Sequence, residues 1–301
     1  MNKLIRHKAE MYRMVDGSVL KQVVAARRDA QSLSTRQGYD ALMKHLRDFA
    51  GDGFDNRVVD EDYVVDFADY LDARVKKSSV RGYIDRLKAL VRAAKSLGLI
   101  DIIPEVNFSG LASKEKSSEK VFLTKDELQR LCLAESPMQS TKNAFLFSCY
   151  TGLLIGEVEQ LCWDSIRYSG SGLVLVRPVE GLDEMVKIPL IEPANNILKE
   201  LEKDYARLPD EQRDDHVFHL CSATAIGKHL RLWADNAHID KKISYSTSRH
   251  TFATMALRAG IDLLVVARWC GYAKVQSAQV YADMVHRVSR SDGEILEAAF
   301  R

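Results

Sequence analysis

The sequence predicts a mainly helical protein of two domains, the first all-α and the second α+β with a small antiparallel sheet. The 301 residues exceed the usual length of one domain and suggest about two. Apolar residues recur at helical spacing along most of the chain, and only one region alternates as paired strands do. A polar segment at 109–120, which contains serine, lysine and glycine, interrupts the pattern and separates the domains as a linker.

The composition is that of a folded globular chain and does not by itself indicate a partner. Hydrophobic residues make up 46% and charged residues 28%, and 43 Lys and Arg against 42 Asp and Glu leave a net charge of +1. The 5 cysteines form no Cys-x-x-Cys pair, the histidines lack metal-ligand spacing and no Gly-rich phosphate loop appears, so we expect neither a metal nor a cofactor. The absence of a signal peptide and of a long apolar run predicts a cytoplasmic protein without a membrane partner.

The first domain is expected at 34–108, after a basic segment, 1–33, that fits either an arm or an exposed terminal helix. Apolar spacing predicts helices over 34–50 and 60–71, and a third helix that Ser79 would cap. Four bases fall on one face of this third helix, beside its apolar stripe: Arg81, Lys88, Arg92 and Lys95. That face is either simply solvated or available to DNA phosphates.

The second domain is expected at 121–288, and Thr124 would cap its first helix, since the spacing to Glu127 is that of a capping box. A helical region is predicted at 141–162, and further helices at 193–208 and 225–237. The predicted strands are 173–179, 184–190 and a short one at 217–220. The helix at 225–237 carries two bases, Lys228 and Arg231, that are available to phosphate groups.

The most informative stretch runs from Ser246 to Met284. Gly260 is placed to end one short helix and Asp262 to cap the next, and a third amphipathic helix follows. Tyr281 lies on or beside the apolar face of that third helix, so periodicity alone makes it a core residue.

The particular residues of this stretch, and their order, change the interpretation of Tyr281 as a core residue. Residues 249–254 read Arg-His-Thr-Phe-Ala-Thr, a glycine follows at 271, and Tyr281 comes next in order. The pattern resembles the tyrosine recombinases, also called the phage integrase family. The resemblance spans about 34–287 and implies a helical core-binding (SAM-like) domain that clamps DNA, joined to a catalytic domain. It also implies that Tyr281 is a nucleophile that forms a 3′-phosphotyrosyl link, and that Arg249 binds the attacked phosphate.

Four other positions of the implied active site are altered in this sequence. Leu154 stands where the family has its first arginine, and Ser246 and Tyr272 stand at the two histidine-type positions. The family's hairpin lysine falls on Gly181 or on Glu180, whose charge would repel a phosphate. Because the lost groups are those that neutralise negative charge, we expect little or no strand cleavage.

The resemblance therefore predicts a DNA-binding protein of the tyrosine recombinase family, involved in DNA recombination or integration as in mobile elements. Its partner would be double-stranded DNA on the nucleoid, and the tail at 289–301 would dock on a neighbouring subunit or on its own domain. One alternative is an active site-specific recombinase with substitute residues; the candidates are Lys187, Arg258, Arg268 and Lys274. Another is a protein-interaction module that does not bind DNA.

Overall fold

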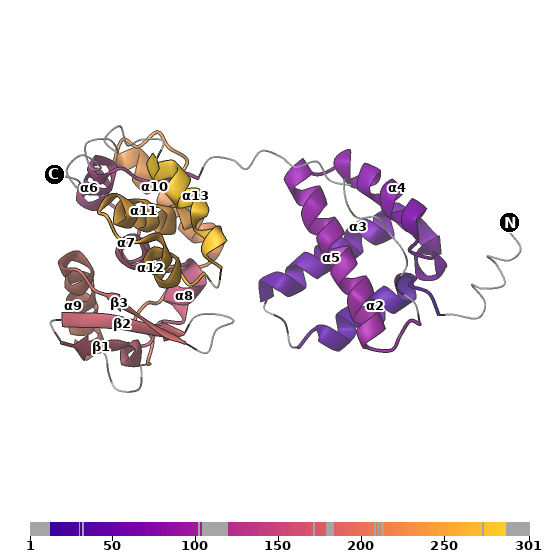
Figure 1. The fold of residues 1–301 in the computed structure, drawn as a ribbon, viewed down its shortest axis with the longest axis horizontal. Coiled ribbons are helices and arrows are strands. Elements are labelled where there is room, and N and C mark those ends of the chain that lie inside the picture. Colours follow the sequence, from indigo (N-terminus) through magenta and orange to yellow (C-terminus); the bar gives the residue numbers. More distant parts are fainter. Residues whose placement is uncertain are drawn as a thin grey trace, which may run out of the picture. The chain divides into compact units, whose positions relative to one another are not determined.

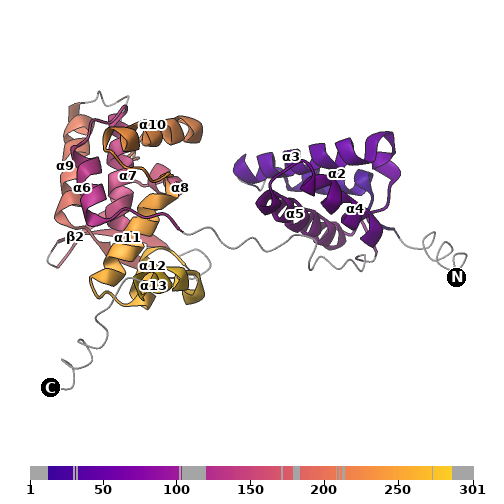
Figure 2. The same ribbon diagram turned by 90° about the horizontal axis from the view of Figure 1, so that it is seen from above.

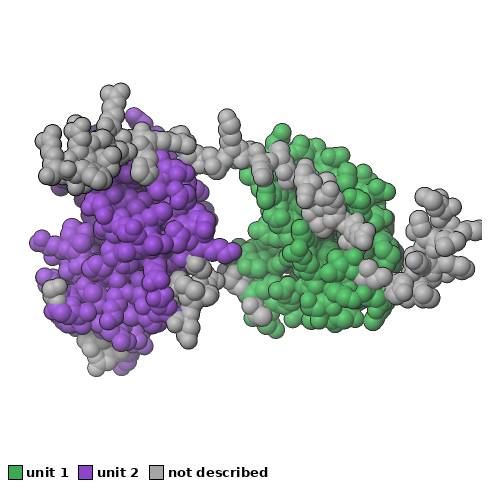
Figure 3. Space-filling model, in the orientation of Figure 1, with its two compact units in different colours: residues 1–118 green, residues 119–301 purple. Residues whose placement is uncertain are grey.

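The chain forms two compact units, residues 1–118 and 119–301 (Figure 3). No helix in the described part of the chain combines the length and the apolar character needed to cross a bilayer. The computed structural model describes residues 13–29, 31, 33–101, 103, 120–170, 172–178, 184–207, 209, 211, 214–272 and 274–286.

The named secondary-structure elements of the first unit, within its described residues, are all helices (Figure 1). Its elements are α2 (Gly17–Arg27), α3 (Leu33–Ala50), the 3-10 helix η1 (Gly51–Asn56), α4 (Glu61–Asp72) and α5 (Lys77–Ser96). The segment at 1–33 thus contains a helix, α2, and its Leu20 and Val23 are fully buried in the core of this unit. Burial of both side chains ties α2 to the other helices of the unit.

The basic helix, α5, begins before the expected cap. Ser79 lies inside the helix, and the N-cap residue is Lys76, whose side chain makes no capping hydrogen bond. The helix is held instead by its apolar stripe, whose residues are buried in the core of the unit: Val80, Ile84, Leu87, Leu90, Val91, Ala93 and Ala94. Arg81 and Arg92 are exposed on the other side.

The second unit is a helical body with a small sheet at its edge (Figures 1 and 2). Thr124 and Glu127 form the predicted capping box at its first helix. The region expected to be helical at 141–162 is divided, because Gly152 adopts φ 77° and ends a helix there. The helices are α6 (Lys125–Leu133), α7 (Gln139–Thr151), α8 (Ile155–Glu159), α9 (Glu192–Arg207), α10 (Ala223–Asn236), α11 (Ser246–Arg258), α12 (Leu263–Trp269) and α13 (Gln279–His286).

The sheet has three antiparallel strands in the order β1-β2-β3: β1 (Ile166–Ser169), β2 (Gly172–Pro178) and β3 (Met185–Pro189). The strand predicted at 217–220 is wrong, and β1 supplies the third strand instead. Next to that segment, His216 makes only an isolated bridge with Cys162. Val217 and Phe218 are both buried, so their apolar run reflects core packing and not strand pairing.

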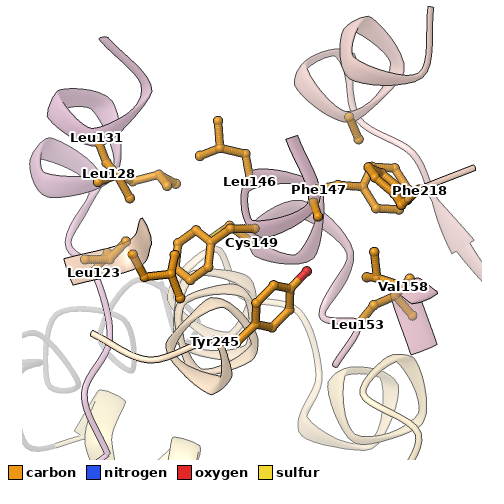
Figure 4. Close-up of a cluster of buried hydrophobic side chains, with 14 of the residues drawn as sticks. Leu123, Leu128, Leu131, Leu146, Phe147, Cys149, Leu153, Val158, Phe218 and Tyr245 are labelled. Carbon is orange, nitrogen blue, oxygen red and sulfur yellow. The ribbon is translucent and has the colours of Figure 1, made fainter. Parts of the chain in front are cut away.

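The core of the second unit surrounds α7, as Figure 4 shows. The ring centroids of Phe147 and Phe218 lie 5.2 Å apart, and those of Phe145 and Tyr245 lie 5.8 Å apart. The Tyr245 hydroxyl satisfies its hydrogen bond on the Ser148 hydroxyl, 3.0 Å away, which makes burial of both groups tolerable. The predicted fold class, an all-α domain and an α+β domain, is confirmed.

We expect Gly152→Ala to lower the free energy of unfolding by about 2 kcal/mol or more. Gly152 has φ 77°, and an added Cβ would lie 2.6 Å from Cδ1 of Phe252. Thermal or denaturant unfolding measures the effect. The matched control is Gly156→Ala in α8, where an added Cβ meets no atom within 4 Å. That change should be neutral or slightly stabilising, so equal loss in both variants would contradict the prediction.

Candidate active site

Arg249 is buried because α11 carries it inside the helical body. Arg249 is only 5% exposed. Thr247, Ser248 and Thr251 are buried on the same helix. The Arg249 Nε donates to the carbonyl oxygen of Gly152 at 2.6 Å, and Nη2 donates to the Glu157 carboxylate. These partners are what make an interior guanidinium tolerable, since an unpaired buried charge is strongly destabilising.

Glu157 collects hydrogen bonds from three different segments. Besides Arg249, its carboxylate accepts from the Leu154 backbone N–H at 2.6 Å and from Arg177 Nη2 at 2.5 Å. The contact with the Leu154 N–H anchors the start of α8. The contacts with Arg249 and Arg177 join that helix to α11 and to β2. One carboxylate therefore holds two guanidinium groups together.

The sequence interpretation did not single out Arg177. It lies on β2 two residues after the buried Leu175, so strand alternation directs it to the same inner face. Its partner in the register is the buried Val186 of β3. Gly271 leaves room for it, since a Cβ there would lie 2.4 Å from Arg177 Nη2. An arginine at an inward position of a strand is the sequence signal that identifies it.

Tyr281 is 1% exposed and lies in a small cluster with Val266, Ala267 and Cys270. Its hydroxyl lies 2.9 Å from His250 Nδ1 and 3.0 Å from the Tyr272 hydroxyl. Burial raises the pKa of Tyr281 well above its ordinary value, and Tyr272 adds to this while Arg249 opposes it. The hydroxyl is therefore protonated at neutral pH and needs a proton acceptor before it can attack a phosphate.

His250 is the acceptor that the structure places nearest to this hydroxyl, and the sequence interpretation treated it as a structural or surface residue. Burial lowers the pKa of His250 to about 4, and the positive charges of Lys120 and Arg249 act in the same direction. A neutral imidazole can accept a proton, whereas an imidazolium cannot. His250 and Tyr281 can therefore share a hydrogen bond, but the lowered pKa of the histidine and the raised pKa of the tyrosine both oppose transfer of the phenolic proton.

The structure brings some of the predicted site residues together and leaves others apart. The Tyr272 ring lies 5.8 Å from the Arg249 guanidinium, so Tyr272 links Arg249 to Tyr281. Leu154 is 37% exposed and contributes only its backbone to Glu157. Ser246 is exposed and its hydroxyl contacts that of Ser244 at 3.0 Å. Gly181 and Glu180 lie outside the described residues.

The four proposed substitutes make other contacts or face solvent. Arg258 lies over the Phe122 ring at 5.2 Å, and Arg268 Nη1 lies 3.2 Å from the Glu184 carboxylate. Lys187 and Lys274 are exposed. The partners of Arg258 and Arg268 are thus Phe122 and Glu184, whereas Arg177 shares Glu157 with Arg249. Arg177, which was not among the four candidates, is therefore the second arginine that binds the same carboxylate as Arg249.

The predicted DNA-binding side chains lie on two helices, one in each unit. Arg81, Arg92 and Lys95 of α5 are exposed and Lys88 is half-buried. Arg81 pairs with Asp85 at 3.7 Å, and Lys95 donates to the Asp101 carbonyl. Lys228 and Arg231 are exposed on α10.

Comparison with known proteins decides the family. Residues 121–286 match the phage integrase family, and residues 18–108 match the phage integrase SAM-like domain. The chain belongs to the phage integrase family. The tyrosine recombinase resemblance, drawn from the motif at 249–254 and from Tyr281, is confirmed.

Curated relatives in the phage integrase family include several recombinases. The chain is 30% identical to tyrosine recombinase XerD of Halalkalibacterium halodurans over 53% of its own length and 56% of the relative. It is 28% identical to tyrosine recombinase XerD of Lacticaseibacillus casei, over 44% and 47% respectively. The chain thus spans about half the length of these relatives.

Solved structures of the phage integrase family share the fold at low identity. XerH site-specific recombinase bound to difH substrate, in a pre-cleavage complex, is 15% identical with a TM-score of 0.66, covering 89% of this chain and 82% of that one. The Tn1549 transposon integrase in complex with transposon right end DNA is 16% identical with a TM-score of 0.65, covering 88% and 94%.

We expect the stability of the protein to fall as the pH is lowered from about 6.5 toward 4, in part through His250. Its pKa is about 4 in the folded chain against 6.5 ordinarily, so between these values the unfolded chain binds more protons. Unfolding midpoints measured across this range for His250→Gln should fall less steeply than for wild type. His219→Gln, at a side chain that is 64% exposed, is the control and should follow wild type. Parallel curves for all three proteins would refute this role.

Proposed function

We propose that the protein binds duplex DNA and takes part in DNA recombination or integration, with weak or no strand cleavage. Membership of the phage integrase family supports the DNA partner. The names of related proteins point the same way, since XerH is described bound to its difH substrate and the Tn1549 integrase bound to transposon DNA. The protein would act on the nucleoid, with 34–108 as a DNA clamp and 121–288 as a catalytic-type domain.

The observation that carries the reduced activity is the state of the phosphate-binding groups. Arg249 is directed at Gly152 and Glu157, and the position of the family's other arginine holds Leu154, a side chain with no donor. Ser246 cannot act as an acid or base near neutral pH. Loss of one preorganised donor from such a site typically costs roughly 3 kcal/mol of transition-state stabilisation, which is on the order of a hundredfold in rate.

The state of Tyr281 supports the same conclusion. Its hydroxyl is enclosed, hydrogen-bonded on two sides and protonated, so attack requires both exposure of the side chain and removal of the proton. A nucleophile of this kind needs activation by neighbouring groups. With Leu154 and Ser246 in place of charged or basic groups, that activation is incomplete.

DNA contact would fall on the basic side chains of two helices. Arg81, Lys88, Arg92 and Lys95 follow one face of α5, while its apolar face is buried in the first unit. Lys228 and Arg231 offer a second contact on α10. Such contacts release counterions from DNA, so binding must weaken as salt rises. Self-association through the tail at 289–301, which lies outside the described residues, belongs to the same proposal.

A second candidate function is an active site-specific recombinase. The observation that favours it is the connected set formed by Arg249, Tyr272 and Tyr281, in which His250 also contacts the Tyr281 hydroxyl. In that case Tyr281 would attack the phosphate while His250 accepts the phenolic proton. The 3′-phosphotyrosyl link would form as the 5′-oxygen leaves.

Covalent trapping on nicked duplexes distinguishes these functions. We expect wild type and Tyr281→Phe to shift the duplex equally on native gels, because phosphate contacts hold the DNA. On denaturing gels we expect little or no adduct with either protein. A strong adduct that disappears in Tyr281→Phe would instead establish the active recombinase, and the absence of any salt-dependent native shift would overturn DNA binding.

Restoring the missing groups tests the cause of the low activity. We expect the double variant Leu154→Arg with Ser246→His to raise the rate of adduct formation on the nicked duplex by about a hundredfold or more, since two donors return to the site. The same pair in the Tyr281→Phe background is the control and should form no adduct. No gain in the double variant, alongside a readily measured wild-type rate, would mean that other residues already supply these roles.

A further inference from the structure

We infer that Arg177 is a phosphate-binding residue of this site and presents, from β2, a guanidinium to bound DNA beside that of Arg249. The inference rests on the proposed function, since the ligand is a phosphodiester of bound DNA. It is carried by three observations: the shared carboxylate of Glu157, the inward direction of Arg177, and an unpartnered nitrogen on its guanidinium.

The shared carboxylate brings the two arginines to the spacing of a single anion. Arg249 Nη2 binds Oε2 of Glu157, and Arg177 Nη2 binds Oε1 of the same group at 2.5 Å. The oxygens of a phosphate are separated by nearly the same distance as those of a carboxylate, and guanidinium forks bind both anions in the same way. A phosphate that binds next to the Glu157 carboxylate, or in its place, would therefore find the Arg177 and Arg249 guanidinium groups already in position.

The unpartnered nitrogen indicates that Arg177 has capacity for a further acceptor. Its Nη1 is buried and has no hydrogen-bond partner within the described ranges. The side chain as a whole is 13% exposed. A buried donor without an acceptor costs about 1–3 kcal/mol, and a phosphate oxygen would satisfy it. Glu157 does not satisfy it, because Arg177 contacts that carboxylate through Nη2.

Charge gives Glu157 a second role in this arrangement. The described cluster holds two guanidinium groups against one carboxylate, so it keeps a positive charge with Glu157 ionised. The carboxylate orients both arginines in the free protein and competes with the phosphate for them. Removal of its charge should therefore strengthen phosphate binding, provided that Arg177 takes part.

The test is a titration of a fluorescent random-sequence duplex with the full chain at several salt concentrations. We expect Arg177→Gln to weaken binding about tenfold or more and to reduce the slope of log affinity against log salt by about 0.9, the value of one phosphate contact. Arg207→Gln removes the same charge from a side chain that is 78% exposed and should leave the slope unchanged. Arg177→Lys should fall between wild type and Arg177→Gln, because it keeps the charge without the fork.

A second set of variants separates this role from damage to the fold. Glu157→Gln should bind the duplex more tightly than wild type, a gain that misfolding cannot produce, and Arg177→Gln in that background should remove the gain. Glu159→Gln, on the same helix, makes the same charge change at an exposed position and should give no such dependence on Arg177.

The outcomes distinguish this inference from the proposed function. If wild type binds with a clear salt dependence while Arg177→Gln matches Arg207→Gln, the inference is overturned and the proposed function stands. If wild type shows no salt-dependent binding, both are overturned.

Discussion

The pairing of Arg249 with Glu157 is the interaction on which the rest of the second unit's site depends. It joins α11 to α8, and through Arg177 the same carboxylate reaches β2. Because Arg249 is nearly fully buried, removal of its partner would leave an interior charge uncompensated, which typically costs about 3–5 kcal/mol. The geometry of the site is therefore a condition of stability as well as a condition of chemistry.

The site has a charged end, around Arg249, and an apolar end, around Tyr281. At one end, charged groups are paired and held by the ends of helices and a strand, with Gly152 accepting from Arg249. At the other end, Tyr281 lies among small apolar side chains and its hydroxyl is shared by His250 and Tyr272. Tyr272 contacts both ends, since its ring lies beside the Arg249 guanidinium and its hydroxyl lies 3.0 Å from that of Tyr281.

Much of the fold followed from the sequence because it rests on local signals. The capping box at Thr124, the cap at Asp262 and the apolar stripe of α5 are all present. The third strand was misplaced because Val217 and Phe218 are buried by packing, and an apolar run of that length does not distinguish packing from pairing. The start of α5 was misplaced because Ser79 resembles a cap although the helix already begins at Lys77.

The site was predicted less completely, since its members come from separate elements. Motif spacing located Arg249, Tyr272 and Tyr281, but no spacing rule connects Arg177 on β2 with Glu157 on α8. That contact depends on the direction of a strand and on the space left by Gly271, which only the folded chain reveals. The contact of His250 with the Tyr281 hydroxyl was not predicted, because a lone histidine without ligand spacing was interpreted as structural.

Gly152 has a consequence for how such chains change over generations. It ends α7, lies against Phe252 and accepts a hydrogen bond from Arg249, so one residue serves both the hydrophobic packing and the placement of the guanidinium. Selection for a stable fold alone would preserve this glycine, Arg249 and Glu157, whether or not the protein cuts DNA. Groups that only serve chemistry, at positions such as Leu154 and Ser246, carry no such protection. The motif at 249–254 therefore contributes to stability through the buried Arg249, whereas Leu154 and Ser246 are exposed and contribute no buried side chain to the fold.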